Sequence, residues 1–366
     1  MEKDAAGCRA LNRNYIVGGV RDMDFMLSFG TSRMGTPLTW AAASNSHLYA
    51  SGQSGQGKSC FLKHCIAQLP GQGVRCIVFD YAGDLHPSGL SCDCLNVRTQ
   101  TGINPFRPLL LGQNCREQPY DIAARVAETV LSIGGTRGSL QQVYLRNTLK
   151  DYIERGEANS GLSGLIAQVQ NTPELARAMA PTLPRLQDLS NLLLPVSQTF
   201  SWPLEYPGIT VLRFDTLPNL SAQTMLTQFL LFDLWSEKVS RSEAGCPVVV
   251  VLDECQRFRF TENSIFSRIL REGRKYHFSG WFASQWISDK RTVETLNQAA
   301  LQTYFYPGND RVNDLAKRLA HGADSIENYK KMLRGLRVGE FLYVDSQSRP
   351  VINCVPRIEE GERCAK

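Results

Sequence analysis

The glycine-rich segment at residues 52–59 constrains the fold of this chain more than any other feature. It reads Gly52-Gln53-Ser54-Gly55-Gln56-Gly57-Lys58-Ser59, a complete G-x-x-x-x-G-K-S pattern. A short apolar strand, His47–Ala50, is predicted directly before it, and a helix with apolar residues at helical spacing directly after it. A strand, a glycine-rich loop and a helix in this order are typical of a P-loop, the phosphate-binding loop of many α/β nucleotide-binding proteins.

Each residue type in this loop suits a phosphate chain. The glycines let the backbone turn its N–H groups inward, and the start of the helix adds its positive dipole end. We expect Lys58 to reach the β- and γ-phosphates and the Ser59 hydroxyl to bind Mg²⁺. The expected nucleotide-binding residues are Gly52, Gln53, Ser54, Gly55, Gln56, Gly57, Lys58, Ser59 and Cys60. A chance match is the alternative, and the flanking strand and helix argue against it.

A second motif supplies acidic groups. The longest apolar run, Val248–Leu252, is followed by Asp253 and Glu254. The carboxyl end of a strand in a P-loop fold faces the phosphate site, so Asp253 is expected to hold Mg²⁺ and Glu254 to polarise the attacking water. The alternative is that Asp253 caps a helix after a buried strand. The second acid favours hydrolysis over binding alone, so the sequence predicts an ATPase that uses ATP and Mg²⁺.

Gln285 follows the next predicted strand, Ser279–Ser284. If this strand lies in the same sheet, the amide of Gln285 can contact both the γ-phosphate and the water. An ordinary surface glutamine is the alternative interpretation.

Predicted strands alternate with helices, which indicates an α/β fold with a mainly parallel sheet covered on both faces. Helical patterns follow one another without a strand from about Gln118 to Pro195, and they predict an all-helical subdomain inserted into the sheet domain. The expected organisation is an N-terminal segment (1–30), the first part of the core (31–112), the helical insertion (113–204), the second part of the core (205–356) and a C-terminal tail (357–366).

Composition excludes several classes of protein. No stretch of about 18 apolar residues occurs, so the sequence predicts no membrane insertion. Met1–Ala10 has no apolar core and does not resemble a signal peptide, and the protein is therefore expected in the cytoplasm. The eleven cysteines are scattered, and the close pair Cys92 and Cys94 lacks the two-residue gap of a zinc knuckle.

Further segments, in this order, resemble the HerA/FtsK superfamily of hexameric DNA pumps, which includes the conjugative coupling ATPases. Residues 35–40 look like a strand leading into the P-loop, and residues 80–84 look like the acidic turn after the second strand. Residues 103–106 (Ile-Asn-Pro-Phe) precede the insertion, and residues 272–276 (Glu-Gly-Arg-Lys-Tyr) followed by Ala283-Ser284-Gln285 look like the family's arginine-finger and sensor segment. Gly339-Glu340-Phe341-Leu342 fits the family's closing strand.

The resemblance implies a RecA-like P-loop NTPase core that assembles into a homo-oligomeric ring, usually a hexamer, with ATP between neighbouring subunits. Arg274 would then enter the neighbour's site and neutralise charge on the γ-phosphate. Arg271, one helical turn earlier, is the rival finger, and a solvated basic helix is the plain alternative. The β-barrel of many HerA proteins and the membrane helices of conjugative coupling proteins have no counterpart in this sequence.

The segment from Cys255 to Arg337 is basic, with fifteen Lys and Arg residues against eight Asp and Glu. Such a surface can neutralise phosphates without reading bases, although solvated helix faces explain many of these charges equally well. The first functional hypothesis is a ring-forming ATPase that translocates double-stranded DNA. The second is an ATP-driven scaffold that organises a partner nuclease or antiviral effector. Protein export ranks last, and the Asp–Glu strand end disfavours a small-molecule kinase.

Overall fold

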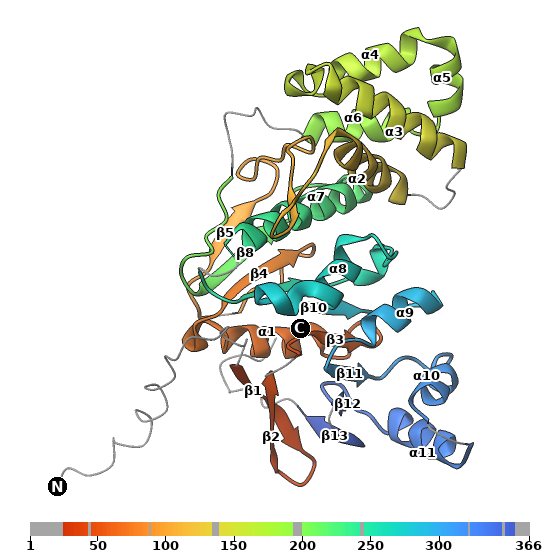
Figure 1. Ribbon diagram of the computed structural model, residues 1–366. Coiled ribbons are helices and arrows are strands. Elements are labelled where there is room, and N and C mark those ends of the chain that lie inside the picture. Colours follow the sequence, from red (N-terminus) through yellow and green to blue (C-terminus); the bar gives the residue numbers. More distant parts are fainter. Residues whose placement is uncertain are drawn as a thin grey trace, which may run out of the picture.

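The computed structural model describes residues 25–355 except 43–44, 88, 134–138, 193–199, 242–244, 321–322 and 346–347. The predicted tail (357–366) and most of the predicted N-terminal segment (1–30) lie outside the described residues. The predicted α/β class is confirmed, because helices pack on an eleven-stranded sheet (Figure 1). No helix of the described part of the chain has both the length and the apolar character needed to cross a bilayer.

The centre of the sheet is parallel. Seven adjacent strands run in one direction in the order β11-β3-β10-β9-β4-β8-β5. Their bounds are β3 Leu48–Ser51, β4 Arg75–Asp80, β5 Asp93–Asn96, β8 Gly208–Arg213, β9 Val248–Leu252, β10 Phe278–Ser284 and β11 Leu301–Phe305. A parallel sheet brings all carboxyl ends to one edge, which is where loops of a binding site gather.

Four antiparallel strands extend the sheet beyond β11 in the order β12-β13-β1-β2. They are β1 Phe25–Ser32, β2 Pro37–Ala42, β12 Phe341–Asp345 and β13 Ser348–Val355. Residues 35–40 were expected to lead into the P-loop. Instead, Pro37–Ala42 is the outermost strand of this extension, and it pairs with β1. β1 itself begins inside the segment 1–30.

Strand β9 shows why the central strands are apolar throughout. Val248, Val250 and Leu252 belong to the core on one face, and Val249 and Val251 belong to the core on the other. Helix α1 (Lys58–Ala67) packs in the second core, and α7 (Leu220–Ser240) packs in the first. A strand that is buried on both faces cannot alternate polar and apolar residues, so the apolar run follows from its position.

The remaining helices divide into two groups. Five of them follow one another between β5 and β8, as the predicted insertion requires, and lie beyond α7 in Figure 1. They are α2 Pro119–Ser132, α3 Ser139–Glu154, α4 Ser163–Asn171, α5 Pro173–Met179 and α6 Leu183–Leu192, and a short hairpin of β6 Leu110–Gly112 and β7 Cys115–Arg116 precedes them. The second group lies among the later strands: α8 Ile265–Glu272, α9 Lys290–Leu296, α10 Val312–Leu319 and α11 Ala323–Arg334.

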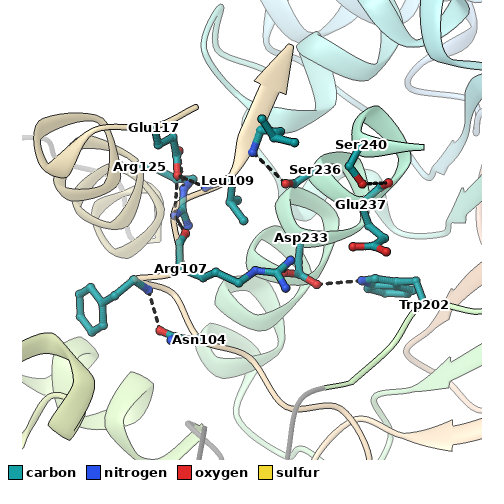
Figure 2. A network of polar contacts seen from close by, with 12 residues as sticks. Asn104, Arg107, Leu109, Glu117, Arg125, Trp202, Asp233, Ser236, Glu237 and Ser240 are labelled. Carbon is teal, nitrogen blue, oxygen red and sulfur yellow. Dashed lines mark hydrogen bonds and ion pairs between the residues drawn. The ribbon is translucent and has the colours of Figure 1, made fainter. Parts of the chain in front are cut away.

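A polar network joins the insertion and the loop before it to α7 (Figure 2). Arg125 of α2 donates to both carboxylate oxygens of Glu117 at 2.8 and 2.9 Å, and its side chain also reaches the carbonyl of Arg107. Arg107 pairs with Asp233 of α7, which also accepts from the Trp202 indole at 2.9 Å. Of these two ion pairs, only Arg125–Glu117 is buried, and removing one of its partners would leave an uncompensated charge. This pair fixes α2 to the preceding loop, and the partly exposed Arg107–Asp233 pair links that loop to α7.

His47 makes the fold sensitive to acid. It lies directly before β3, is 3% exposed, and its Nδ1 accepts from the Gly280 N–H at 2.9 Å. Burial lowers the pKa of His47 from 6.5 to about 4. The unfolded chain therefore takes up a proton between these two pH values that the folded chain does not, and folding stability falls as the pH drops through this range.

We expect His47 to account for a loss of about 3 kcal/mol between pH 7 and pH 4. Urea unfolding of the wild type and of His47→Asn across this range measures it, because asparagine keeps an acceptor without the titration. As the pH falls from 7 to 4, the free energy of unfolding of the wild type should decrease more than that of His47→Asn. Parallel losses in both proteins would contradict the prediction.

Candidate nucleotide-hydrolysis site

The sequence-predicted site residues gather at the carboxyl edge of the parallel sheet. β10 lies between β3 and β9, with Ser284 level with Ser51 and Phe282 level with Leu252. The P-loop follows β3, Asp253 follows β9 and Gln285 follows β10, so three segments far apart in sequence meet at one place. This convergence is the condition on which the predicted hydrolysis chemistry depends.

The P-loop is packed tightly against the strand on its other side, β11. A Cβ at Gly52 would lie 2.5 Å from the Cβ of Phe305, so only glycine allows this approach. The Gln53 N–H donates to the Tyr306 carbonyl at 2.9 Å. Gly57 has a φ of 104°, in the left-handed region, at the point where the loop turns into α1. The loop conformation is thus determined by its neighbours before any phosphate binds.

Lys58 is folded back over this loop. Its side-chain ammonium donates to the carbonyls of Gly52 at 2.8 Å and Gln53 at 3.0 Å, and the residue is 7% exposed. Burial lowers the pKa of Lys58, while Asp253 and Glu254 act in the opposite direction. A triphosphate would give this desolvated ammonium a stronger set of acceptors than two carbonyls.

Ser59 and Asp253 form the second part of the site. The Ser59 hydroxyl donates to Asp253 Oδ2 at 3.3 Å. Burial raises the pKa of Asp253, and the Glu254 N–H, Lys58 and Ser59 partly offset this effect. A hydroxyl and a carboxylate side by side are hard oxygen ligands, of the kind that bind Mg²⁺ together with waters and phosphate oxygens. The residues present therefore fit the predicted metal.

Glu254 adopts a conformation that is unusual for its residue type. Its φ of 57° and ψ of 34° place it in the left-handed region. Strain of this kind concentrates at functional sites, and here the turn points the Glu254 N–H at Asp253 Oδ1, 2.7 Å away. The two acids are therefore held in a fixed relation to each other at the end of β9.

Three side chains hold the Glu254 carboxylate. Gln285, which was expected to contact the γ-phosphate and the water, donates to Oε1 at 3.1 Å, and Gln256 donates to Oε2 at 2.8 Å. Arg257 approaches Oε2 at 3.5 Å; it also stacks on the Tyr81 ring at 5.0 Å and donates to Gln223 of α7 at 3.1 Å. Gln256 and Arg257 were not predicted. Only the left-handed turn at Glu254 brings them back toward the carboxylate, and no residue pattern reveals that turn.

Arg274 does not join this cluster. It is exposed, and it lies in the turn before β10, whereas Gln285 follows the same strand. The length of β10 therefore separates it from the site by roughly 20 Å. The rival residue Arg271 donates to the Glu262 carbonyl at 2.7 Å. Within one chain Arg274 cannot reach the triphosphate, so any role in hydrolysis requires a neighbouring subunit.

Comparison with known proteins adds the fold family. No protein-family model and no curated protein matches the sequence. Among solved structures, VirB4 of Thermoanaerobacter pseudethanolicus is similar, with a TM-score of 0.66, 15% identity, and 91% of this chain and 97% of that chain covered. The bacterial conjugative coupling protein TrwBΔN70 in complex with sulphate has a TM-score of 0.63 at 16% identity, with 91% and 90% covered. TrwB in complex with ADP and Mg²⁺ has a TM-score of 0.58 at 16% identity.

These similarities cover nearly the whole chain at low identity, and they show a shared fold. The fold that the resemblance implied is therefore confirmed, and the comparison shows the fold alone. The RecA-like P-loop core is thus common to this chain and to the structures it matches.

Proposed function

We propose that this chain is an ATP hydrolase that assembles into a ring, with a hexamer expected, and uses hydrolysis to translocate double-stranded DNA. The observation that carries the hydrolase assignment is the convergence of Lys58, Ser59, Asp253, Glu254 and Gln285 at one edge of the sheet. The TrwB structures in complex with an ATP analogue and with ADP and Mg²⁺ support the choice of ligands. The domain boundaries given above are part of the same proposal.

The chemistry assigned to each residue follows from its position. The P-loop N–H groups and Lys58 bind the β- and γ-phosphates, and Ser59 and Asp253 would hold Mg²⁺, which would supply positive charge to the phosphate oxygens. Glu254 orients the attacking water and accepts its proton as the water oxygen bonds to the γ-phosphorus and the bridging P–O bond breaks. Gln285 touches Glu254 and would adjust with it when the γ-phosphate leaves. Arg274 of a neighbouring subunit would complete the site.

A cleft beside the site offers a candidate surface for DNA. It has a volume of about 990 Å³ and begins at Gln256, which contacts Glu254. Three arginines line it together with Trp286, and three acids balance their charge: Arg259, Arg271 and Arg291 against Glu262, Asp289 and Glu294. Guanidinium groups in an open cleft can track a phosphate backbone without reading sequence. The proposal of DNA as the partner is therefore supported by the arginines of this cleft and by the basic excess of residues 255–337, and not by a net positive charge of the cleft.

The test is the ATPase rate of the purified protein with and without duplex DNA, alongside its mass in solution. We expect DNA to stimulate hydrolysis, with an affinity that falls steeply as ionic strength rises. Arg291→Ala should weaken DNA binding about equally for all DNA sequences. It should also reduce the slope of log affinity against log salt concentration by about one. Lys150→Ala, on α3, is the control and should leave DNA binding unchanged. Hydrolysis indifferent to DNA of every form would count against translocation.

The exposed face of α3 favours the second candidate, a scaffold for a separately encoded effector. Leu140, Val143 and Tyr144 are 70%, 42% and 42% exposed and lie at helical spacing on one side of the helix. Exposed apolar groups gathered on one face are typical of interaction sites. An ATPase that ignores DNA but loses a partner when Leu140 is changed to Glu would favour this candidate over the first.

A further inference from the structure

The position of the acids determines which side of the P-loop the nucleoside occupies. β3 has two parallel neighbours, β10 on one side and β11 on the other. Glu254 and Gln285, which attend the γ-phosphate in the proposed function, lie on the β10 side. An extended nucleotide bound through its β-phosphate must therefore direct its ribose and base toward the side of β11 and β12.

On that side, the connection between α11 and β12 touches the P-loop. The Gly339 N–H donates to the Gln56 carbonyl at 3.0 Å. A Cβ at Gly57 would lie 3.0 Å from the Gly339 Cα, so the two backbones meet where both residues are glycine. Gly339 itself has a φ of 87°, which favours glycine. Residues 336–340 thus form a wall against the start of α1, and we call this segment the β12 loop.

A buried acid fixes the β12 loop in place. Glu340 is 6% exposed, and its carboxylate accepts from the Arg337 N–H at 2.9 Å and from Arg33 Nε at 3.1 Å. Arg33, at the end of the β1 hairpin, also donates to the Gly335 carbonyl at 2.7 Å. The hydrogen bond of Arg33 and the backbone of Arg337 lower the pKa of Glu340 against the opposing effect of burial. The loop is therefore anchored from both its P-loop side and its β1 side.

Val338 is the exception in this anchored loop. It is 70% exposed, although it lies directly before the residue that contacts the P-loop. A rigid backbone that holds an apolar side chain in water next to a phosphate site is pre-organised to cover an aromatic ring. Resting on the proposed function, we propose that Val338 and the backbone of the β12 loop form the nucleobase face of the ATP site.

The experiment separates the base from the phosphates. In the full chain, Val338→Asp should weaken ATP and ADP binding about tenfold by removing an apolar contact. Binding of inorganic tripolyphosphate with Mg²⁺, measured by the same calorimetry, should weaken less than ATP binding, because the new carboxylate repels both ligands but only ATP loses a contact with its base. Val338→Ile should restore nucleotide affinity. Val143→Asp, at an exposed valine of the insertion, is the matched control and should bind ATP like the wild type.

The other outcomes are also decisive. If Val338→Asp binds ATP normally, or loses ATP and tripolyphosphate equally, the base does not rest on Val338. If the wild type binds tripolyphosphate as tightly as ATP, the nucleobase subsite is absent while the phosphate site stands. If the wild type binds neither ligand, the proposed ATPase function fails, and this inference fails with it.

Discussion

Replacing Glu254 by Gln should reduce ATP turnover by about a thousandfold or more while leaving ATP binding intact. The amide keeps the size of the side chain and can still meet Gln285, but it cannot accept a proton from water. Because Lys58, Ser59 and Asp253 are unchanged, the phosphate and Mg²⁺ contacts remain. Phosphate release and the ATP dissociation constant, measured on the same preparation, separate the two effects.

Glu154→Gln supplies the matched control for this experiment. Glu154 is an exposed acid of α3 that pairs with Lys150 at 2.7 Å, so its loss should leave turnover unchanged. If Glu254→Gln hydrolyses ATP at the wild-type rate, Glu254 does not activate the attacking water. A variant that has lost ATP binding as well would assign Glu254 to the binding of nucleotide.

The second large effect concerns Arg274 and requires two variants. Arg274→Ala should lose about three orders of magnitude in hydrolysis if this residue completes a neighbour's site. Lys58→Ala should be inactive for a different reason, because its own phosphate site is damaged. Mixing the two proteins creates interfaces at which an intact P-loop faces an intact Arg274. With random assembly, roughly a quarter of the interfaces are of this kind, so a comparable share of the activity should return.

Arg271→Ala is the control for the arginine experiment, since Arg271 lies three residues away and is bound to the Glu262 carbonyl. Because Arg271 also lines the cleft proposed for DNA, the rates are compared without DNA, and Arg271→Ala should then retain most of the wild-type rate. Mixtures that stay inactive, although both variants assemble with the wild-type mass, would exclude Arg274 as a group acting between subunits. If Arg271→Ala shows the complementation instead, the finger is Arg271.

The parts of the fold that the sequence predicts well are those buried on both faces. β9 has the same bounds as predicted, Val248–Leu252, because a central parallel strand consists of little except apolar residues. The antiparallel strands beyond β11 are harder to predict from the sequence. β2 has exposed and buried positions in alternation, contains a proline, and lies at the sheet edge, where the sequence pattern carries less information. β5, with exposed or half-buried residues only, was not predicted for the same reason.

The residues of the candidate site also fall into those that the sequence predicts and those that it does not. Lys58, Ser59, Asp253 and Glu254 could be predicted, since each stands at a position that strand ends and loop glycines define. The partners of Glu254 could not, because Gln256 and Arg257 reach it only through a left-handed turn at a residue that rarely adopts one. The place of Val338 beside the P-loop could not be predicted from the sequence either. It depends on the contact between Gly57 and Gly339, which are 282 residues apart.

Helix α7 has contacts of a different kind near its two ends. Toward its start, Gln223 holds Arg257, which approaches the Glu254 carboxylate; farther along, Asp233 and Ser236 hold Arg107 and Leu110 at the root of the insertion. A helix of 21 residues is about 31 Å long and stiff. A tilt of this single rod would shift the guanidinium beside Glu254 and swing the five inserted helices together. The contacts that hold the Glu254 carboxylate and those at the root of the insertion therefore share one rigid helix.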